Sequence, residues 1–264
     1  MRVMTYNIRH GLGTDGVLDL SRIARVIAQE TPDFVAIQEI DRFWSRSGGV
    51  DQPEELAAML DMQVCYAPNL EMPPERAGAP PVQYGVAILS RFPIGGWNHT
   101  RFPEVDGWEP RGLLAIEAEI APGQRVGVFC THLQVSYSGN DAEGSRQRAE
   151  QVAIVRDLAR SMGIPAIIMG DFNAEPDAGE LASLLGNGTG FQDAWLVSGA
   201  GTSGFTVPAA IDREAERRID YILVSPDIDV VRCRVTVDGE TRLASDHFPV
   251  VADLSLDSGG LGNQ

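Results

Sequence analysis

The sequence contains few cysteines. Cys65, Cys130 and Cys233 are the only three among 264 residues, they lie far apart, and no CxxC pair occurs. An odd number at such spacing argues against a disulfide framework and against a zinc–thiolate site. Because Cys130 lies in the apolar run VGVFCTHL, we interpret it as a buried and inert thiol.

Basic residues are also scarce. Lys and Arg number 21 against 37 Asp and Glu, so the formal net charge is -16. A large acidic field repels polyanions at long range, and non-specific nucleic-acid binding depends on Lys and Arg side chains that neutralise phosphates. A nucleic-acid partner is therefore disfavoured and would require a local basic cleft.

Long apolar runs are absent as well. No window approaches the stretch of about 20 apolar residues that a membrane span needs, and the first residues, MRVMTYNIRHG, lack the apolar core of a signal peptide. Hydrophobic residues make up 44% of the chain and charged residues 22%, an ordinary balance for a globular protein. We predict a soluble cytoplasmic protein without a membrane span.

Hydrophobic periodicity predicts a chain of alternating strands and helices. Strands are predicted at 2–8, 33–40, 62–68, 84–90, 94–102, 113–120, 125–133, 165–172, 217–225, 229–238 and 248–256. Helices are predicted at 18–30, 53–60, 141–162 and 178–186. Either Asp19 or Ser21 could cap the first helix, and the proline-rich residues 69–83 are interpreted as a surface loop.

The order of these elements predicts the architecture. Some strands are hairpin neighbours and others are separated by helices, which indicates mixed sheets covered by helices in an α/β fold. No repeat or linker divides the chain. We therefore predict one domain over residues 1–256, followed by a flexible tail over residues 257–264, DSGGLGNQ.

One strand ends in a way that needs an explanation. In IIMGDFNA, an apolar run climbs to Gly170 and is followed by Asp171 and, one residue later, Asn173. If the extended conformation continues, both side chains point the same way and two oxygen-bearing groups converge at the edge of a sheet. The alternative is a simple turn, since Asp and Asn are common turn residues.

Other predicted strands also end in polar residues. The set comprises Asn7 in TYNIR, Glu39 in AIQEID, His132 in VFCTHL, Asp220 in RRIDYIL, and Asp246 and His247 in ASDHFPV. Each has a structural alternative as a turn residue, a helix cap or a core histidine. Asp220 lies between two apolar residues, where an unpaired carboxylate would be costly to bury.

Together these residue types indicate phosphoester chemistry. Carboxylate and amide oxygens are hard ligands that suit Mg²⁺, Mn²⁺ or Ca²⁺ better than Zn²⁺. A histidine with a buried aspartate partner makes a general base of fixed orientation. A cation, a base and donors for developing charge are what hydrolysis of a phosphoester requires.

The motifs TYNIR, QEID, THL, GDFN, RIDYI and SDHFPV occur in the order found in the endonuclease/exonuclease/phosphatase superfamily. The chain resembles this group, which includes DNase I, the abasic endonucleases, neutral sphingomyelinases and inositol polyphosphate 5-phosphatases. The resemblance extends from Thr5 to Val250. It implies a DNase I-like four-layer α/β sandwich, in which two mixed β-sheets pack face to face with helices on the outside.

The resemblance also implies a cation site and its neighbours. Glu39 corresponds to the main ligand of Mg²⁺ or Mn²⁺, and Asn7 and Asp246 correspond to further ligands beside it. Asp171 and Asn173 correspond to residues that orient water and hold the phosphate or a metal.

The resemblance further implies the acid–base residues. His247 corresponds to the general base, paired with Asp220. His132 matches the histidine of the DNase I and sphingomyelinase branches that stabilises or protonates the phosphoryl group. In DNase I that histidine has a glutamate partner on the strand that reads PVQYGVAIL here, but Gln83 and Tyr84 stand there and no carboxylate does.

Several further residues are secondary candidates for contacts with the substrate. Arg9 and Arg111 could contact the phosphate through their charge, and Arg148 and Gln151, one helical turn apart, could reach the site or lie on the helix surface. His10 and His99 are interpreted as structural or solvated. Four aromatic residues in or near predicted loops could line a substrate pocket or pack in the core; these are Trp44, Trp97, Trp108 and Phe205.

The sequence thus predicts a metal-dependent phosphoester hydrolase, and specifically a phosphodiesterase acting on a small molecule or a lipid headgroup. The acidic charge and the absence of a basic, aromatic-interleaved insertion favour this over the alternative, a DNase I-like nuclease. A non-catalytic binding scaffold with the same fold is the alternative from another class. Fold alone does not identify the substrate.

Overall fold

The computed structural model describes residues 1–136, 139–185, 190–201, 203–208 and 215–256. The predicted tail at 257–264 lies outside the described residues. The prediction of a single domain over 1–256 stays a prediction.

The described residues form two mixed six-stranded sheets. The first has the order β13-β14-β1-β2-β4-β3 and the second the order β5-β6-β7-β8-β12-β9. The strands of the first sheet are β1 (Arg2–Asn7), β2 (Phe34–Arg42), β3 (Gln63–Met72), β4 (Val82–Ser90), β13 (Ile228–Val235) and β14 (Val250–Leu256). Those of the second are β5 (Ile94–Arg101), β6 (Gly112–Ala121), β7 (Gln124–His132), β8 (Ala166–Asp171), β9 (Gln192–Asp193) and β12 (Asp220–Val224).

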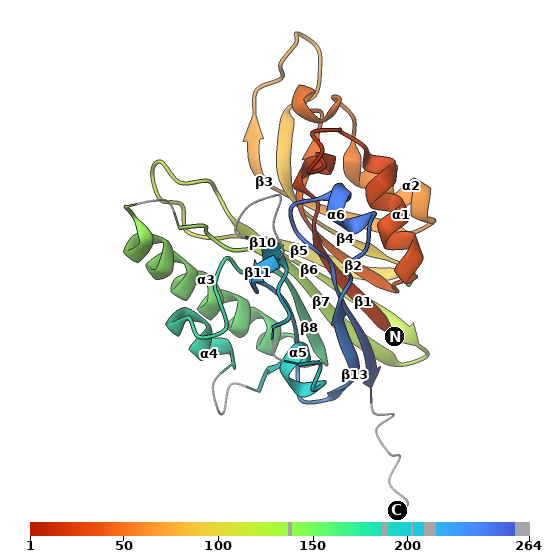
Figure 1. The fold of residues 1–264 in the computed structure, drawn as a ribbon, viewed down its shortest axis with the longest axis vertical. Coiled ribbons are helices and arrows are strands. Elements are labelled where there is room, and N and C mark those ends of the chain that lie inside the picture. The colour runs from red at the N-terminus through yellow and green to blue at the C-terminus, as the bar shows by residue number, and fades with distance from the viewer. Residues whose placement is uncertain (137–138, 186–189, 202, 209–214, 257–264) are drawn as a thin grey trace, which may run out of the picture.

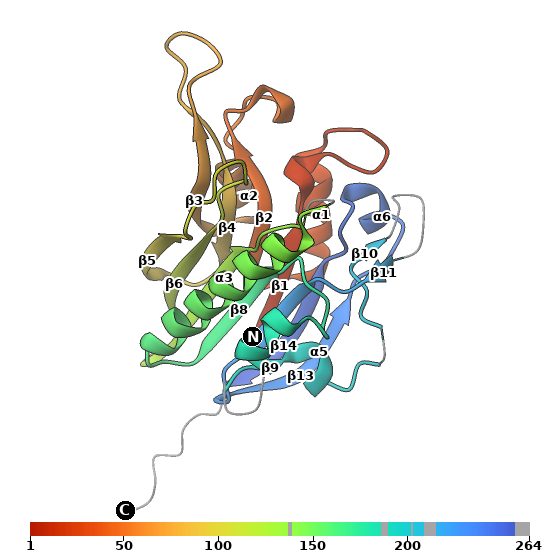
Figure 2. The ribbon, with the colours of Figure 1, turned by 90° about the vertical axis from the view of Figure 1, so that its left-hand side faces the viewer.

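Helices cover the outer face of each sheet (Figures 1 and 2). In Figure 1, α1 (Leu20–Glu30) and α2 (Gln52–Leu60) lie to the right, and α3 (Asp141–Ser161) and α4 (Ala182–Leu185) lie to the left. The shorter elements are α5 (Ala194–Val197), α6 (Thr241–Ala244), 3-10 turns at Arg9–Gly11, Ser45–Ser47 and Gly179–Leu181, and the hairpin β10 (Val207–Pro208) and β11 (Ala215–Arg217).

Three apolar layers hold this arrangement together. The central layer joins the inner faces of the sheets, as with Phe34 and Ile167. A second layer packs α1 and α2 on the first sheet through residues such as Ile27, and a third packs α3 on the second sheet through residues such as Val155. The predicted four-layer α/β sandwich is therefore confirmed.

Local sequence explains several boundaries. Asp19 caps α1 by accepting a hydrogen bond from the Arg22 amide at 3.0 Å, which selects Asp19 over Ser21 as the cap. Asp51 caps α2, with Pro53 in its first turn. Pro122 and Gly123 separate β6 from β7, and Gly123 has a positive φ of 76°.

Three predicted boundaries were wrong. The predicted loop 69–83 is shorter, because β3 and β4 stay paired as far as Met72 and Val82. The predicted strand 217–225 is two strands, because Arg217 pairs with Val207 in the small hairpin while β12 begins at Asp220. The predicted helix 178–186 is a 3-10 turn followed by α4, and residue 186 lies outside the described residues.

The topology brings several strand ends together at one edge. Strands β1 and β2 are parallel, and so are β7 and β8. The carboxyl ends of parallel neighbours meet at the same edge of a sheet. Asn7 ends β1 and donates a hydrogen bond to Asp171, which ends β8. The corresponding edges of the two sheets therefore lie against each other, and we call them together the polar edge.

Candidate active site

The site is centred on Asp171, the last residue of β8. In the strand register, Asp171 lies between His132 of β7 and Asp220 of β12. Its side chain is almost completely buried. The preceding Gly170 allows the close approach of β7, because a Cβ there would lie 2.1 Å from the carbonyl oxygen of Thr131.

The strand does not continue to Asn173. Asn173 has a φ of 50°, so the alternation of faces ends at Asp171, and the expectation that both side chains share one face of an extended strand was wrong. The Asn173 amide instead donates to Asp171 Oδ1 at 2.9 Å. Its side chain donates to the Leu133 carbonyl at 3.1 Å. The turn alternative is correct, and this turn holds the Asp171 carboxylate in place.

Asn7 links the two sheets through its amide. Its Nδ2 donates to Glu39 Oε1 and to Asp171 Oδ2, both at 3.1 Å. Its Oδ1 accepts from the backbone amide of Arg9 at 3.1 Å. The side-chain amide therefore fixes the distance between two carboxylates that would otherwise repel each other.

Glu39 projects into the site from a β-bulge. The register of β2 against β4 shifts between Gln38 and Ile40, and Glu39 between them has a φ of 57°. A non-glycine residue at positive φ is strained, and such strain is often found at functional sites. Burial, followed by the charge of Asp246, raises the pKa of Glu39.

His247 and Asp220 form the predicted pair. His247 Nδ1 lies 2.9 Å from Asp220 Oδ2, and that oxygen also accepts from Thr206 Oγ1 at 2.6 Å. His247 Nε2 faces Asp171 Oδ2 at 3.8 Å. Burial alone would lower the pKa of His247, but the charges and hydrogen bond of its carboxylate neighbours, Asp220 foremost, outweigh burial and raise it to about 10.

Asp171 is affected by the same crowding. Burial first, and then the charge of Asp220, raise the pKa of Asp171 to about 7. Burial and the neighbouring Asp220 carboxylate thus disfavour the charged form of Asp171, and the charge of His247 offsets them only in part.

His132 has an arginine as its partner. Its Nδ1 lies 2.9 Å from Arg111 Nη1, and its Nε2 lies 3.4 Å from Asp171 Oδ2. Arg111 also forms an ion pair with Glu109 at 2.6 Å. Burial, then the charges of Arg111 and His247, hold the pKa of His132 well below its usual range.

The remaining candidates occupy different places. Arg9 lies at the rim, where its Nε is 3.5 Å from Asp246 Oδ2. Arg148 and Gln151 are buried and hold the segment after β7, through bonds to the carbonyl and amide of Gln134 at 3.0 and 2.9 Å. Arg148 also pairs with Glu180 at 2.7 Å, so its role is structural.

Three of the aromatic and histidine candidates have contacts or exposure that place them apart from this cluster, namely Trp44, Trp97 and His99. Trp44 stacks on the guanidinium of Arg46, with 3.5 Å between that group and the ring centre. Trp97 is exposed on β5. His99 Nε2 is bonded to Asn69 Oδ1 at 3.0 Å, which supports a structural interpretation of His99.

Sequence reasoning missed two supporting hydroxyl groups. Thr206 holds Asp220, as described above, and Ser245 donates to the Asn7 carbonyl at 2.8 Å and accepts from the His247 amide at 3.3 Å. Ser245 precedes Asp246 in the SDH motif and was within reach of motif reasoning. Thr206 lies in an irregular glycine-rich stretch that carries no periodic signal.

The donor set was tested for its fit to a divalent cation. Within the described residues, ligand atoms of Asp171, Asp220 and His247 lie within 4.8 Å of one another. Asp220 Oδ2 is already bonded to His247 and Thr206, so this trio suits acid–base chemistry better. The negative charge of Asp246 contributes to the raised pKa of Glu39. The hard oxygens of these two carboxylates fit Mg²⁺ or Mn²⁺.

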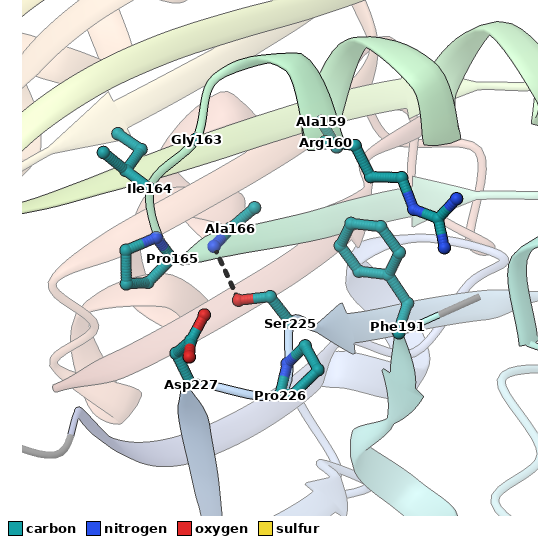
Figure 3. A pocket seen from close by; sticks show the side chains of 11 residues that line it. Ala159, Arg160, Gly163, Ile164, Pro165, Ala166, Phe191, Ser225, Pro226 and Asp227 are labelled. Atoms are coloured by element: carbon teal, nitrogen blue, oxygen red, sulfur yellow. Dashed lines mark hydrogen bonds between the residues drawn. The ribbon is translucent and has the colours of Figure 1, made fainter. Parts of the chain in front are cut away.

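A cavity of about 480 Å³ lies at the opposite end of β8 (Figure 3). Its lining includes Ala166, whose amide donates to Ser225 Oγ at 2.9 Å, together with Arg160 and Asp227. Ala166 begins β8 and Asp171 ends it, a separation of roughly 17 Å along a strand. This cavity is therefore separate from the polar edge.

Comparison with known proteins identifies the family. The family model described as "Endonuclease/Exonuclease/phosphatase family" matches residues 4–247. The chain belongs to this family. The prediction made from the six motifs is confirmed, and the members of the family are hydrolases acting on phosphoesters. No curated protein sequence matches the chain.

Solved structures of the endonuclease/exonuclease/phosphatase family share the fold. A protein of this family from Beutenbergia cavernae is 31% identical, with a TM-score of 0.77 over 97% of this chain and 71% of that one. A mannosyl-6-phosphatase from Bacteroides thetaiotaomicron is 21% identical, with a TM-score of 0.71 over 97% and 100%. The human Nocturnin catalytic domain, solved with a bound sulfate anion, is also 21% identical, with a TM-score of 0.71 over 97% and 94%.

The architecture carries no membrane-crossing helix in the described part of the chain, since none is long and apolar enough. Membership of the family establishes a phosphoesterase fold. The chemistry of this particular site follows from its own residues.

Proposed function

We propose that this protein is a metal-dependent phosphoester hydrolase in which His247 activates water. The observation that carries the proposal is the buried pair of His247 and Asp220, aimed at Asp171 on an edge shared with Asn7 and Glu39. Asp220 fixes the ring orientation, because its bond to Nδ1 leaves Nε2 free to accept a proton.

The acidic edge supplies the proposed cation ligands. Glu39 and Asp246 would hold Mg²⁺ or Mn²⁺, while Asn7 acts as the donor that links Glu39 to Asp171. When bound, the cation would neutralise phosphoryl oxygens and offset the carboxylate charges that raise the pKa of His247. Asp246 is accessible enough for this role, with about 35% of its side chain exposed.

The chain's own groups would carry the remaining steps. Water is held between His247 Nε2 and Asp171 Oδ2, which lie 3.8 Å apart, and Asn173 keeps that carboxylate in place through its backbone amide. His247 takes the water proton as the oxygen attacks phosphorus. His132, Arg111 and, from the rim, Arg9 face the developing negative charge.

Charge supports the proposed substrate class. A net charge of -16 and a site whose arginines are few and mostly paired favour a small phosphodiester or a lipid headgroup over a polyanion. The related mannosyl-6-phosphatase is a phosphatase by name, which makes a monoester the comparison to include in the test.

The deciding experiment compares three substrates. Bis-p-nitrophenyl phosphate, p-nitrophenyl phosphate and plasmid DNA are incubated with Mg²⁺, with Mn²⁺ and with EDTA, beside His247→Ala. Metal-dependent diester cleavage with intact plasmid supports the proposal. Nicking of the plasmid that is lost in His247→Ala would identify a nuclease, and metal binding without turnover of any substrate would identify a binding scaffold.

The cation ligand is tested separately with Glu39→Gln. The substitution keeps the shape but removes the charge, so Mg²⁺ affinity measured by titration calorimetry should fall by at least about tenfold, the scale on which metal-site substitutions act. Glu55→Gln, an exposed position on α2, is the matched control. Equal affinity in both variants would remove Glu39 from the cation site.

A further inference from the structure

The pairing of Arg111 with His132 determines which ring nitrogen of the histidine carries a proton. Both side chains are buried, with 6% and 3% exposure, and Arg111 Nη1 lies 2.9 Å from His132 Nδ1. A guanidinium has N–H donors and no acceptor. His132 Nδ1 must therefore be the acceptor, and it carries no proton while this contact persists.

The single proton of the neutral ring then lies on Nε2. That atom faces Asp171 Oδ2 at 3.4 Å, on the side of the site where His247 approaches the same oxygen. A second proton on Nδ1 would set an N–H group against the buried guanidinium at hydrogen-bond distance. The charged and titratable groups around the pair are Tyr84, Glu109, Glu39, Asp171 and His247.

We propose that Arg111 is a positioning residue that holds His132 as the neutral Nε2–H tautomer, so that His132 donates a hydrogen bond to the phosphoryl group and does not protonate the leaving group. This deepens the proposed function and rests on it. The low pKa of His132, caused by burial and by the charge of Arg111, agrees with the same assignment.

The surroundings of Arg111 support a fixed position. Its carbonyl accepts from the Phe102 amide at 3.0 Å, and its guanidinium forms an ion pair with Glu109. The next residue, Gly112, lets the side chain of Asn69 lie close to the backbone, because a Cβ at position 112 would lie 2.4 Å from Asn69 Oδ1. Arg111 Nε is buried and has no acceptor among the described residues.

The assignment changes how the bond to the leaving group breaks. His247 removes the proton from water, a new P–O bond forms, and the bond from phosphorus to the leaving oxygen breaks with the electron pair on that oxygen. With His132 neutral, the leaving oxygen takes its proton from solvent. The rate of the chemical step should then depend steeply on the acidity of the leaving alcohol or phenol.

The tautomer is measurable in the metal-free protein. Long-range ¹H–¹⁵N correlation spectra distinguish an imidazole protonated on Nε2 from one protonated on Nδ1, and His132→Gln assigns the signal. We expect the Nε2–H pattern in the wild type, its loss in Arg111→Met, and its return in Arg111→Lys, which restores a donor. Arg125→Met, at the far end of β7 in an exposed pair with Glu117, should leave the pattern unchanged.

Two results would overturn the proposal. One is a wild-type spectrum with His132 protonated on Nδ1, which needs no variant and so does not depend on the folding of Arg111→Met. The other is an unchanged Nε2–H pattern in folded Arg111→Met, because the arginine would then not set the tautomer.

Kinetics provide a second, separate readout. A series of aryl phosphodiesters of graded leaving-group acidity should show a steep dependence of kcat in the wild type, and Arg111→Met should lower kcat by roughly 100-fold. A flat dependence would show that an acid protonates the leaving group and would contradict the role given to His132. Absence of all turnover alongside the expected spectrum would count against the proposed hydrolase and leave the tautomer assignment standing.

Discussion

Two histidines approach the same carboxylate oxygen with opposite partners. His132 Nε2 lies 3.4 Å and His247 Nε2 lies 3.8 Å from Asp171 Oδ2. Both rings are buried, yet the pKa is lowered for His132 and raised for His247. Burial lowers both, and the charged group with the largest effect is the partner on Nδ1, which is Arg111 for His132 and Asp220 for His247.

The comparison shows how one strand register can separate two roles. Asp220 lies directly beside Asp171 on β12, while Arg111 precedes β6, the neighbour of β7. Arg111 thus lies just before the strand that pairs with β7, which ends in His132. Asp220 begins the strand that pairs with β8, which ends in Asp171. A carboxylate prepares one ring to hold a proton, and a guanidinium keeps the other neutral.

The largest effect is expected from His247→Ala. Loss of a general base typically lowers kcat by roughly 10²- to 10⁴-fold, and in the proposed reaction no other side chain replaces it. Single-turnover kinetics on bis-p-nitrophenyl phosphate measure this, with circular dichroism to confirm folding. Full activity in a folded His247→Ala would mean that His247 is not the general base and would point to His132 in that role.

A smaller effect is expected when Asp220 loses its second hydrogen bond. Thr206→Val removes the donor at 2.6 Å from Asp220 Oδ2. A hydrogen bond to a charged group contributes about 1.5 to 3 kcal/mol, so kcat/KM should fall by roughly tenfold or more, through a displaced His247.

Thr236→Val is the matched control for this variant. Thr236 Oγ1 also donates to a carboxylate at 2.6 Å, which is that of Glu30, the last residue of α1. We expect some loss of thermal stability in both variants and loss of activity in Thr206→Val alone. Equal activity in both would mean that Asp220 needs no support from Thr206.

The smallest effect concerns pH and stability at His132. An unfolded histidine has a pKa of about 6.5, whereas His132 in the folded chain stays neutral to lower pH. Below pH about 6.5 the unfolded chain binds a proton that the folded chain does not, so the free energy of unfolding falls as pH falls.

Urea unfolding of the metal-free protein, above and below that pH, measures this slope. His132→Gln should reduce the slope by at most about 1.4 kcal/mol per pH unit, the limit for one proton. An identical slope in both proteins would show that His132 titrates normally and would weaken the contrast with His247.

Much of the fold was open to prediction from periodicity and motif order. The strand that carries Phe34 and the helix capped by Asp19 have local patterns that survive in the structure. The pairing of His247 with Asp220 was implied by the resemblance to the family, and it agrees with the expectation that a carboxylate within an apolar strand needs a partner. Their contact is confirmed at 2.9 Å, and the catalytic roles remain predictions.

Other features depended on contacts between distant segments. The left-handed turn at Asn173 and the bulge at Glu39 leave no sign in a periodic pattern, because they arise where one strand must accommodate its neighbour. The choice of Arg111 as the partner of His132 joins two positions 21 residues apart. The sequence lacks the carboxylate that partners this histidine in DNase I and left its partner open, and only the packed sheet shows the guanidinium.

Residue types and their order were enough to predict an acidic α/β protein of a phosphoesterase family with its polar groups at strand ends, since hydrophobic alternation and hard oxygen ligands are local properties. The different surroundings of its two histidines appeared only in three dimensions. A pKa depends on burial and on charges within a few ångströms, and those distances exist only once β6, β7, β8 and β12 lie side by side.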